Sequence, residues 1–169
     1  MICIVFPGKS LDYAVAVNNT WGQHCTELRF YHHKMKNATL PIRTLPSGSA
    51  FELLCSALLE ISREKVKFDW MFFATDNTFV IPENFRYYVA ALNSSDPHYL
   101  GHTMTFWQVR YNWKNAGFAV SRGTVTALLA KFQDKKACAA GGRFWNNEDW
   151  YLGKHLHGLG IKPVDTRYG

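Results

Sequence analysis

A single acidic side chain, Asp76, stands directly after a long apolar run at residues 70–74. The run does not alternate between apolar and polar positions, which predicts a strand buried on both faces at the centre of a parallel sheet. Ligands of open α/β sheets collect at the carboxyl ends of such strands. Asp76 is therefore placed to bind a hard divalent cation, with Thr75 and Asn77 offering neutral oxygens beside it. The same residues also fit an ordinary turn between that strand and a second one expected at residues 79–81.

A second acidic pair, Glu148-Asp149, follows Asn147 at the expected start of a helix. A carboxylate at such a position can take a proton from a hydroxyl group during group transfer. Acidic residues in the first turn also simply complement the positive end of the helix dipole. From spacing alone, both interpretations of the pair stay open.

Strands and helices alternate along the chain, so the expected fold is α/β within one domain that covers residues 1–169. Residues 32–48 and 138–142 are expected to be irregular. Helix starts are marked by Ser49 with Glu52, by Ser121 and by Pro82. Strands are expected at 2–6, 28–31, 70–74, 99–103, 116–120 and 161–164, and helices at 10–18, 49–61, 82–92, 121–132 and 147–159.

The composition, 47% hydrophobic with 15% aromatic residues, predicts a folded core and excludes a disordered chain. The net charge of +6 is spread over several short segments, so no nucleic-acid partner is expected. Four cysteines without metal-ligand spacing fit disulfides in an oxidising compartment. Cys3, on the first expected strand, and Cys25, just before the second, can come within disulfide reach.

The segment from Asp69 to Arg86 resembles the metal-site block of the core 1 β1,3-galactosyltransferase family, within the β1,3-glycosyltransferases. The shared features are Asp-Trp followed by aromatics and then Thr-Phe-Val-Ile-Pro-Glu-Asn-Phe-Arg, with Thr75-Asp76-Asn77 between them at the position of the family's acidic cluster. Thr-Trp-Gly-x-x-Cys at residues 20–25 and Glu-Asp-x-x-Leu-Gly at residues 148–153 extend the resemblance over nearly the whole chain. It implies a GT-A-type glycosyltransferase fold, with a Rossmann-like, mostly parallel sheet and helices on both faces.

The resemblance also implies roles for single residues. Asp76 and Asn77 correspond to metal-site positions for Mn²⁺, while Asp69, Asp76 and Lys9 correspond to positions that meet the nucleotide-sugar, UDP-galactose. Asp149 or Glu148 corresponds to the catalytic base. Active members carry three consecutive aspartates where this chain has Thr75-Asp76-Asn77.

Further family positions concern residues 99–103 and Cys138. Tyr-Leu-Gly-His-Thr at residues 99–103 resembles the family's chaperone branch, the core 1 galactosyltransferase-specific chaperones. Cys138 corresponds to a family cysteine whose usual partner position is occupied here by His155.

Two functions follow from the resemblance. The first is a non-catalytic chaperone or partner of an active core 1 β1,3-galactosyltransferase, in a hetero- or homodimer. The second is an active enzyme that moves galactose from UDP-galactose to N-acetylgalactosamine on glycoprotein acceptors. Either would work in the lumen of the Golgi or endoplasmic reticulum, and membrane attachment would come only from an anchor, as in type II membrane proteins, that this chain does not include. A further C-terminal segment is expected as well.

Overall fold

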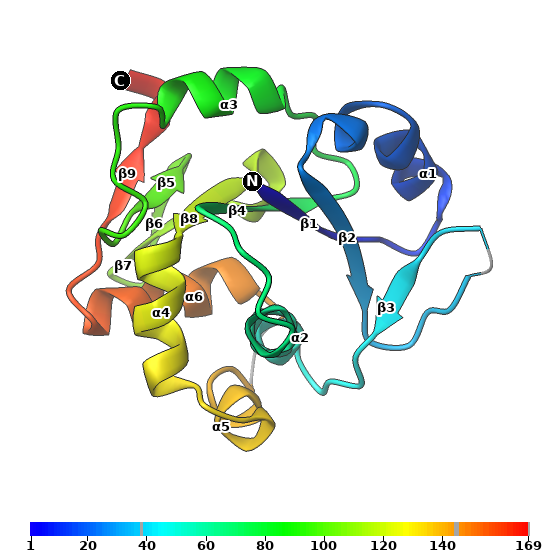
Figure 1. Ribbon diagram of the computed structural model, residues 1–169. Helices are drawn as coiled ribbons and strands as arrows, with labels where there is room; N and C mark the ends of the chain where they lie inside the picture. The colour runs from blue at the N-terminus through cyan, green and yellow to red at the C-terminus, as the bar shows by residue number, and fades with distance from the viewer. Residues whose placement is uncertain (38, 144–145, 169) are drawn as a thin grey trace.

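A seven-stranded sheet, flanked by helices on both faces, forms the centre of the computed structural model, which describes residues 1–37, 39–143 and 146–168 (Figure 1). The strands of this sheet are β1 (Ile2–Phe6), β2 (Glu27–His32), β3 (Ile42–Thr44), β4 (Trp70–Thr75), β5 (Tyr99–Gly101), β8 (Phe118–Ser121) and β9 (Pro163–Asp165). A separate hairpin consists of β6 (Thr103–Phe106) and β7 (Val109–Asn112). The α-helices are α1 (Asp12–Asn19), α2 (Ala50–Arg63), α3 (Pro82–Tyr88), α4 (Arg122–Lys131), α5 (Lys135–Ala140) and α6 (Glu148–Gly158). Short 3₁₀ turns are η1 (Trp21–His24), η2 (Lys114–Ala116) and η3 (Thr166–Tyr168).

The strand order is β3-β2-β1-β4-β8-β5-β9, and β4 lies at its middle as the apolar run predicted. β4 pairs in parallel with β1 but antiparallel with β8, which also runs antiparallel to β5. The expectation that β4 has parallel neighbours on both sides is therefore wrong on one side. The mostly parallel α/β sheet with helices on both faces is confirmed.

Side chains of β4 alternate between two hydrophobic cores. Met71 and Phe73 point into the core formed with α2, α4 and α6, in the lower half of Figure 1. Trp70, Phe72 and Ala74 point into the core formed with α1, η1 and α3. Both faces of the strand are thus removed from water, which explains why its sequence is continuously apolar.

The start of α2 follows the predicted capping pattern. The Ser49 hydroxyl accepts a hydrogen bond from the Glu52 N–H (3.1 Å), and the Glu52 carboxylate accepts one from the Gly48 N–H (2.7 Å). These bonds satisfy backbone donors that the first turn of a helix leaves free. Behind the cap, one apolar face of the helix is fully buried against the sheet: Phe51, Leu54, Cys55, Leu58 and Ile61.

Three local predictions differ from the structure. Residues 79–81 form no strand but lead into α3, with Phe79 74% exposed. The expected loop at 138–142 largely belongs to α5, whose first turn is capped by the Asp134 side chain bonding to the Ala137 N–H (2.8 Å). Within residues 32–48, the short strand β3 pairs with β2 and forms the edge of the sheet.

All four cysteines are paired. The Cys3–Cys25 disulfide joins β1 to the segment before β2, as the strand positions predicted. The second disulfide, Cys55–Cys138, joins α2 to α5 and was not predicted, because 83 residues separate the two positions. Cys138 therefore pairs with Cys55, and the family position taken by His155 instead packs its ring on Phe51.

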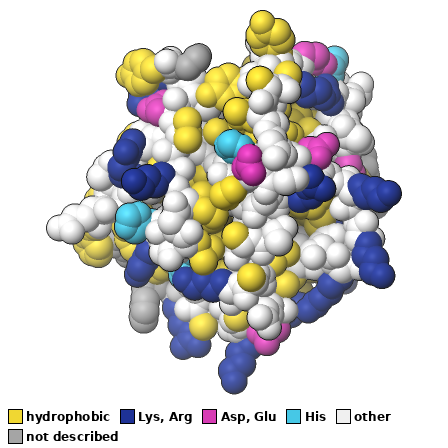
Figure 2. All heavy atoms as spheres, turned by 60° about the vertical axis from the view of Figure 1, so that its left-hand side comes forward, with side chains coloured by type: hydrophobic (Ala, Val, Ile, Leu, Met, Phe, Trp, Pro, Cys, Tyr) yellow, Lys and Arg dark blue, Asp and Glu magenta, His cyan; other side chains and the backbone are white. Residues whose placement is uncertain are grey.

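The surface carries no single basic face in the view that brings β9 and the β6–β7 hairpin forward (Figure 2). Lys and Arg side chains are spread around its margin, with apolar side chains exposed between them. Within residues 1–37, 39–143 and 146–168, no helix is both long and apolar enough to cross a membrane.

Candidate functional site

Asp76 lies at the carboxyl edge of the sheet, where β1 and β4 end side by side. Phe6, the last residue of β1, is in register with Thr75, the last residue of β4. The loops that follow therefore meet, and the Gly8 N–H donates a hydrogen bond to Asp76 Oδ2 (2.8 Å). Asp76 is buried, with only 8% of its surface exposed. One oxygen of the Asp76 carboxylate therefore already holds the loop after β1 to the loop after β4 by a hydrogen bond.

The two neighbours of Asp76 are hydrogen-bonded to each other. The Thr75 hydroxyl donates to the Asn77 side-chain oxygen. It also lies 3.0 Å from the Thr78 hydroxyl, which donates to the Asn115 carbonyl (3.2 Å). The two positions that carry carboxylates in the resembling family are here neutral and mutually satisfied.

This donor set does not fit Mn²⁺. Hard divalent cations favour several carboxylates converging on one point, whereas the loop offers one carboxylate that is already bonded to Gly8. In the part of the chain that the structure describes, no group of three or more His, Cys, Asp or Glu side chains is arranged to hold a metal ion.

Glu148 opens α6 and forms an ion pair with Lys114 of η2, with Oε2 and Nζ 2.9 Å apart. Glu148 is 6% exposed, and burial raises the pKa of its carboxyl group, while the neighbouring ammonium of Lys114 lowers it. A buried carboxyl group with a raised pKa beside a cavity is a candidate proton acceptor.

Asp149 has a different environment. Its Oδ2 accepts the Lys114 backbone N–H (3.0 Å) and its Oδ1 accepts the Trp150 N–H (2.9 Å). The residue is 3% exposed, so both oxygens are committed to the backbone. Asp149 therefore positions η2 against α6, and of the two acidic residues Glu148 is the one that faces a cavity.

A cavity of about 320 Å³ brings Glu148 and Thr75 together. It is bounded by the carboxyl ends of β1, β2 and β4 and by the first residues of α2. His32 contributes a hydrogen-bond donor, because its Nδ1 accepts the N–H groups of Lys34 (3.1 Å) and Met35 (2.8 Å), which leaves the ring hydrogen on Nε2. The Ser47 hydroxyl, also in the lining, is buried and has no hydrogen-bond partner among the described residues.

Sequence reasoning missed three of these lining residues: Lys114, His32 and Ser47. Lys114 lies in a segment without helical or strand periodicity, and only the contact between η2 and α6 brings it to Glu148. Ser47 and His32 lie in or next to the stretch expected to be irregular. Of the three, His32 could have been predicted from the strand at residues 28–31, because it ends β2 at the same edge of the sheet as Thr75.

Lys9 and Asp69 lie at opposite edges of the sheet. Lys9 is exposed and follows β1 at the carboxyl edge, next to the Gly8–Asp76 bond. Asp69 precedes β4, and its carboxylate accepts a hydrogen bond from the Ser94 hydroxyl (2.9 Å). Six strand residues at about 3.3 Å each put Asp69 roughly 20 Å from Asp76. The structure therefore does not bring Asp69 to the candidate site.

No family model matches the chain. The sequence is 22% identical over 175 residues to glycoprotein-N-acetylgalactosamine 3-beta-galactosyltransferase 1 of Xenopus laevis, an alignment that covers 99% of this chain and 47% of the relative. This chain thus spans about half the length of that curated relative. The fold is similar to the crystal structure of a glycosyltransferase involved in the glycosylation of the major capsid of PBCV-1, with a TM-score of 0.50 and 13% identity over 97% of this chain and 81% of the other.

The structural match and the order of the strands both support the same conclusion: the chain has a glycosyltransferase fold. By weak sequence similarity it is galactosyltransferase-like.

Proposed function

We propose that this chain is a galactosyltransferase-like protein that has lost metal-dependent sugar transfer and acts as a chaperone or partner of an active core 1 β1,3-galactosyltransferase. The observation that carries this proposal is the state of the loop after β4. Thr75 and Asn77 are neutral and bonded to each other, and Asp76 is bonded to the Gly8 N–H. Charge supplies most of the affinity for a hard cation, so this loop would hold Mn²⁺ weakly.

The proposed compartment is the lumen of the Golgi or endoplasmic reticulum. Two disulfides support it, because disulfides persist in oxidising compartments and are rare in the cytosol. The proposed partner is the active galactosyltransferase of mucin-type O-glycosylation.

Titration calorimetry of UDP, with and without Mn²⁺, tests the loss of the metal site. We expect the affinity for UDP to be independent of Mn²⁺ in the wild-type protein. Two variants serve as controls: Asp76→Ala removes the bond to Gly8, while Asp76→Asn keeps an acceptor oxygen and removes only the charge. Metal-dependent binding that both variants abolish would contradict the proposal and favour an enzyme.

Co-expression tests the partner role. An active core 1 galactosyltransferase is produced in secretory cells with and without this chain, and soluble galactosyltransferase activity is measured. We expect a several-fold higher yield of active enzyme together with a complex that survives gel filtration. An unchanged yield without a complex would rule out the chaperone role.

The Glu148 cavity favours a second candidate, an active β1,3-galactosyltransferase. Glu148 is buried, its pKa is raised, and it faces the cavity at the carboxyl edge of the sheet. In that role the carboxylate would take the proton of the acceptor hydroxyl as the new glycosidic bond forms and UDP leaves, with Lys114 as the nearest cation. Transfer from UDP-galactose to an N-acetylgalactosamine glycoside that disappears in Glu148→Gln but persists in Asp76→Asn would establish this candidate.

A further inference from the structure

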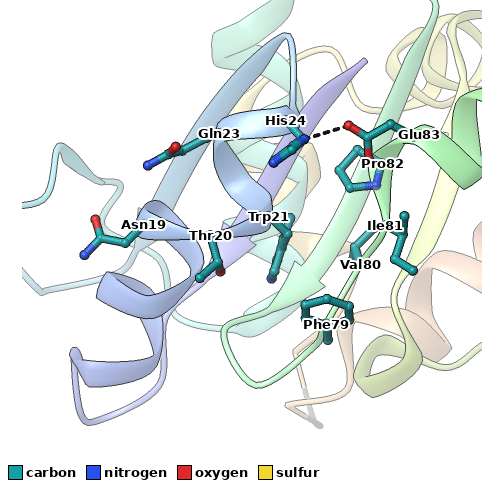
Figure 3. A pocket seen from close by; sticks show the side chains of 10 residues that line it. All are labelled: Asn19, Thr20, Trp21, Gln23, His24, Phe79, Val80, Ile81, Pro82 and Glu83. Atoms are coloured by element: carbon teal, nitrogen blue, oxygen red, sulfur yellow. Dashed lines mark hydrogen bonds and ion pairs between the residues drawn. The ribbon is translucent and has the colours of Figure 1, made fainter.

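A second groove lies on the face of the sheet that α1 and α3 cover, away from Glu148. One wall is the end of α1 with η1, and the other is the segment from Phe79 to Glu83 (Figure 3). Its volume is about 340 Å³, and it shares no lining residue with the Glu148 cavity. Any ligand of this groove would therefore bind independently of that cavity.

Polar contacts hold the two walls of this groove in place. His24 Nδ1 lies 2.6 Å from Glu83 Oε1, and Figure 3 shows these two side chains pointing at each other across the groove. The Arg86 guanidinium donates to the His24 carbonyl. The Cys3–Cys25 disulfide fixes the residue that follows η1. The groove is therefore preformed, which lowers the entropy cost of binding.

The floor and rim of the groove differ in chemistry. Trp21 and Val80 are buried beneath it, at 5% and 8% exposure. Phe79 is 74% exposed at the rim, so nearly a whole aromatic ring is open to a ligand. Gln23 adds an exposed side-chain amide on the opposite wall.

The charges of the lining select the class of ligand. Among the described residues that line the groove there is no Lys or Arg, and the one carboxylate, Glu83, is paired with His24 and lies 4.0 Å from the Arg86 guanidinium. An anionic ligand would meet that carboxylate, and the basic side chains beside it, His24 and Arg86, are already engaged with Glu83 and the His24 carbonyl. An apolar ligand would leave the amides and the carboxylate desolvated. A neutral ligand with one apolar face can pack that face on the Phe79 ring. Its hydroxyl groups can form hydrogen bonds with the polar side chains of the lining.

We propose that this groove binds a neutral carbohydrate, a mono- or disaccharide. The C–H face of a pyranose ring packs on Phe79, and its hydroxyl groups bond to the Gln23 amide and to the Glu83 carboxylate. The volume is at the small end of ligand pockets, about 300–1,000 Å³, which fits one or two sugar rings. This site would make the protein a carbohydrate-binding module whether or not it transfers sugar.

Nuclear magnetic resonance titration tests the proposal with methyl β-galactoside, methyl α-N-acetylgalactosaminide and lactose, each at millimolar concentration. We expect saturable shifts of the Trp21 indole N–H and the Gln23 amide for at least one sugar. Trp21→Phe assigns the indole signal. Shifts of these signals with a control peptide and with none of the sugars would overturn the proposal in favour of a peptide groove.

Two variants locate the binding. Phe79→Ala removes an exposed ring and should leave the fold intact, as circular dichroism would verify, while it weakens sugar binding at least tenfold. Tyr87→Ala is the matched control, because Tyr87 is 86% exposed on α3 and does not line the groove. Equal affinity in Phe79→Ala and wild type, or no saturable shift with any of the sugars, would refute the proposal. The UDP titration reports separately on the Asp76 loop, so failure here leaves the proposed function standing.

Discussion

Replacing Lys114 with methionine removes the cation that lies 2.9 Å from the Glu148 carboxylate and keeps an unbranched side chain one atom shorter. At neutral pH the change leaves the carboxylate of Glu148, a residue only 6% exposed, without its ion-pair partner. Removing one partner of a buried ion pair costs about 3–5 kcal/mol. Because the Lys114 side chain is 26% exposed, water compensates in part, and we expect the low end, about 3 kcal/mol. At roughly 2–4 °C per kcal/mol, the melting temperature should fall by roughly 6–12 °C.

The loss should depend on pH. Burial raises the folded-state pKa of Glu148 above its ordinary value of 4.5, and Lys114 lowers it, so the variant has a higher folded pKa than wild type. A carboxyl group with a raised folded pKa binds its proton more tightly in the folded state, so stability decreases as pH rises above the unfolded pKa. This decrease should be larger in the variant. The difference in unfolding free energy between the two proteins should therefore be small near pH 4 and larger at pH 7.

Urea unfolding followed by tryptophan fluorescence measures this difference at both pH values. Lys162→Met is the matched control, because Lys162 is exposed and its loss should change stability by less than about 0.5 kcal/mol. A destabilisation by Lys114→Met that is equal at the two pH values, or below about 1 kcal/mol at neutral pH, would refute the assignment of a buried, Lys114-stabilised carboxylate.

Three further variants test other parts of the structure by thermal and urea unfolding. Replacing both Cys55 and Cys138 with serine opens a loop with 83 residues of sequence separation and should cost about 4–5 kcal/mol; an unchanged stability would argue against the disulfide. Gly117→Ala should cost about 1–3 kcal/mol, because φ is +75° and a Cβ would lie 2.6 Å from the Phe72 ring, and a neutral outcome would contradict this backbone conformation. Asp149→Asn removes one of two oxygens that accept backbone N–H groups and should cost about 1–3 kcal/mol, whereas full stability would indicate an exposed side chain.

Local signals in the sequence were enough to predict the main elements. The apolar run of β4 predicted a central strand because burial on both faces leaves no polar position. Ser49 with Glu52 predicted the start of α2, and Ser121 the start of α4, because each cap is completed within three residues. The edge of the sheet that carries Asp76 followed from the same reasoning.

The unpredicted features depend on contacts between distant segments. β8 enters the sheet antiparallel, a direction that no local pattern in residues 118–121 encodes. The aromatic and β-branched character of residues 79–81 predicted a strand, yet Phe79 lies exposed at a groove instead. The different roles of Glu148 and Asp149 depend on which oxygens the η2 backbone and the Lys114 side chain reach. The start of α5 could have been predicted locally, because Asp134 caps it through the Ala137 N–H three residues later.

The Cys55–Cys138 disulfide also has a topological consequence. The covalent ring that it closes contains β4, α3, β5, the β6–β7 hairpin, β8 and α4, whereas β1, β2 and α6 lie outside it. A single cut in an exposed turn of that ring, such as the one at residues 93–96, would leave both pieces covalently joined. The C-terminal piece, which carries β8 and α6, would stay tethered to α2 by the disulfide even after proteolysis. Cutting this turn should therefore open the chain without releasing a fragment until a reductant is added.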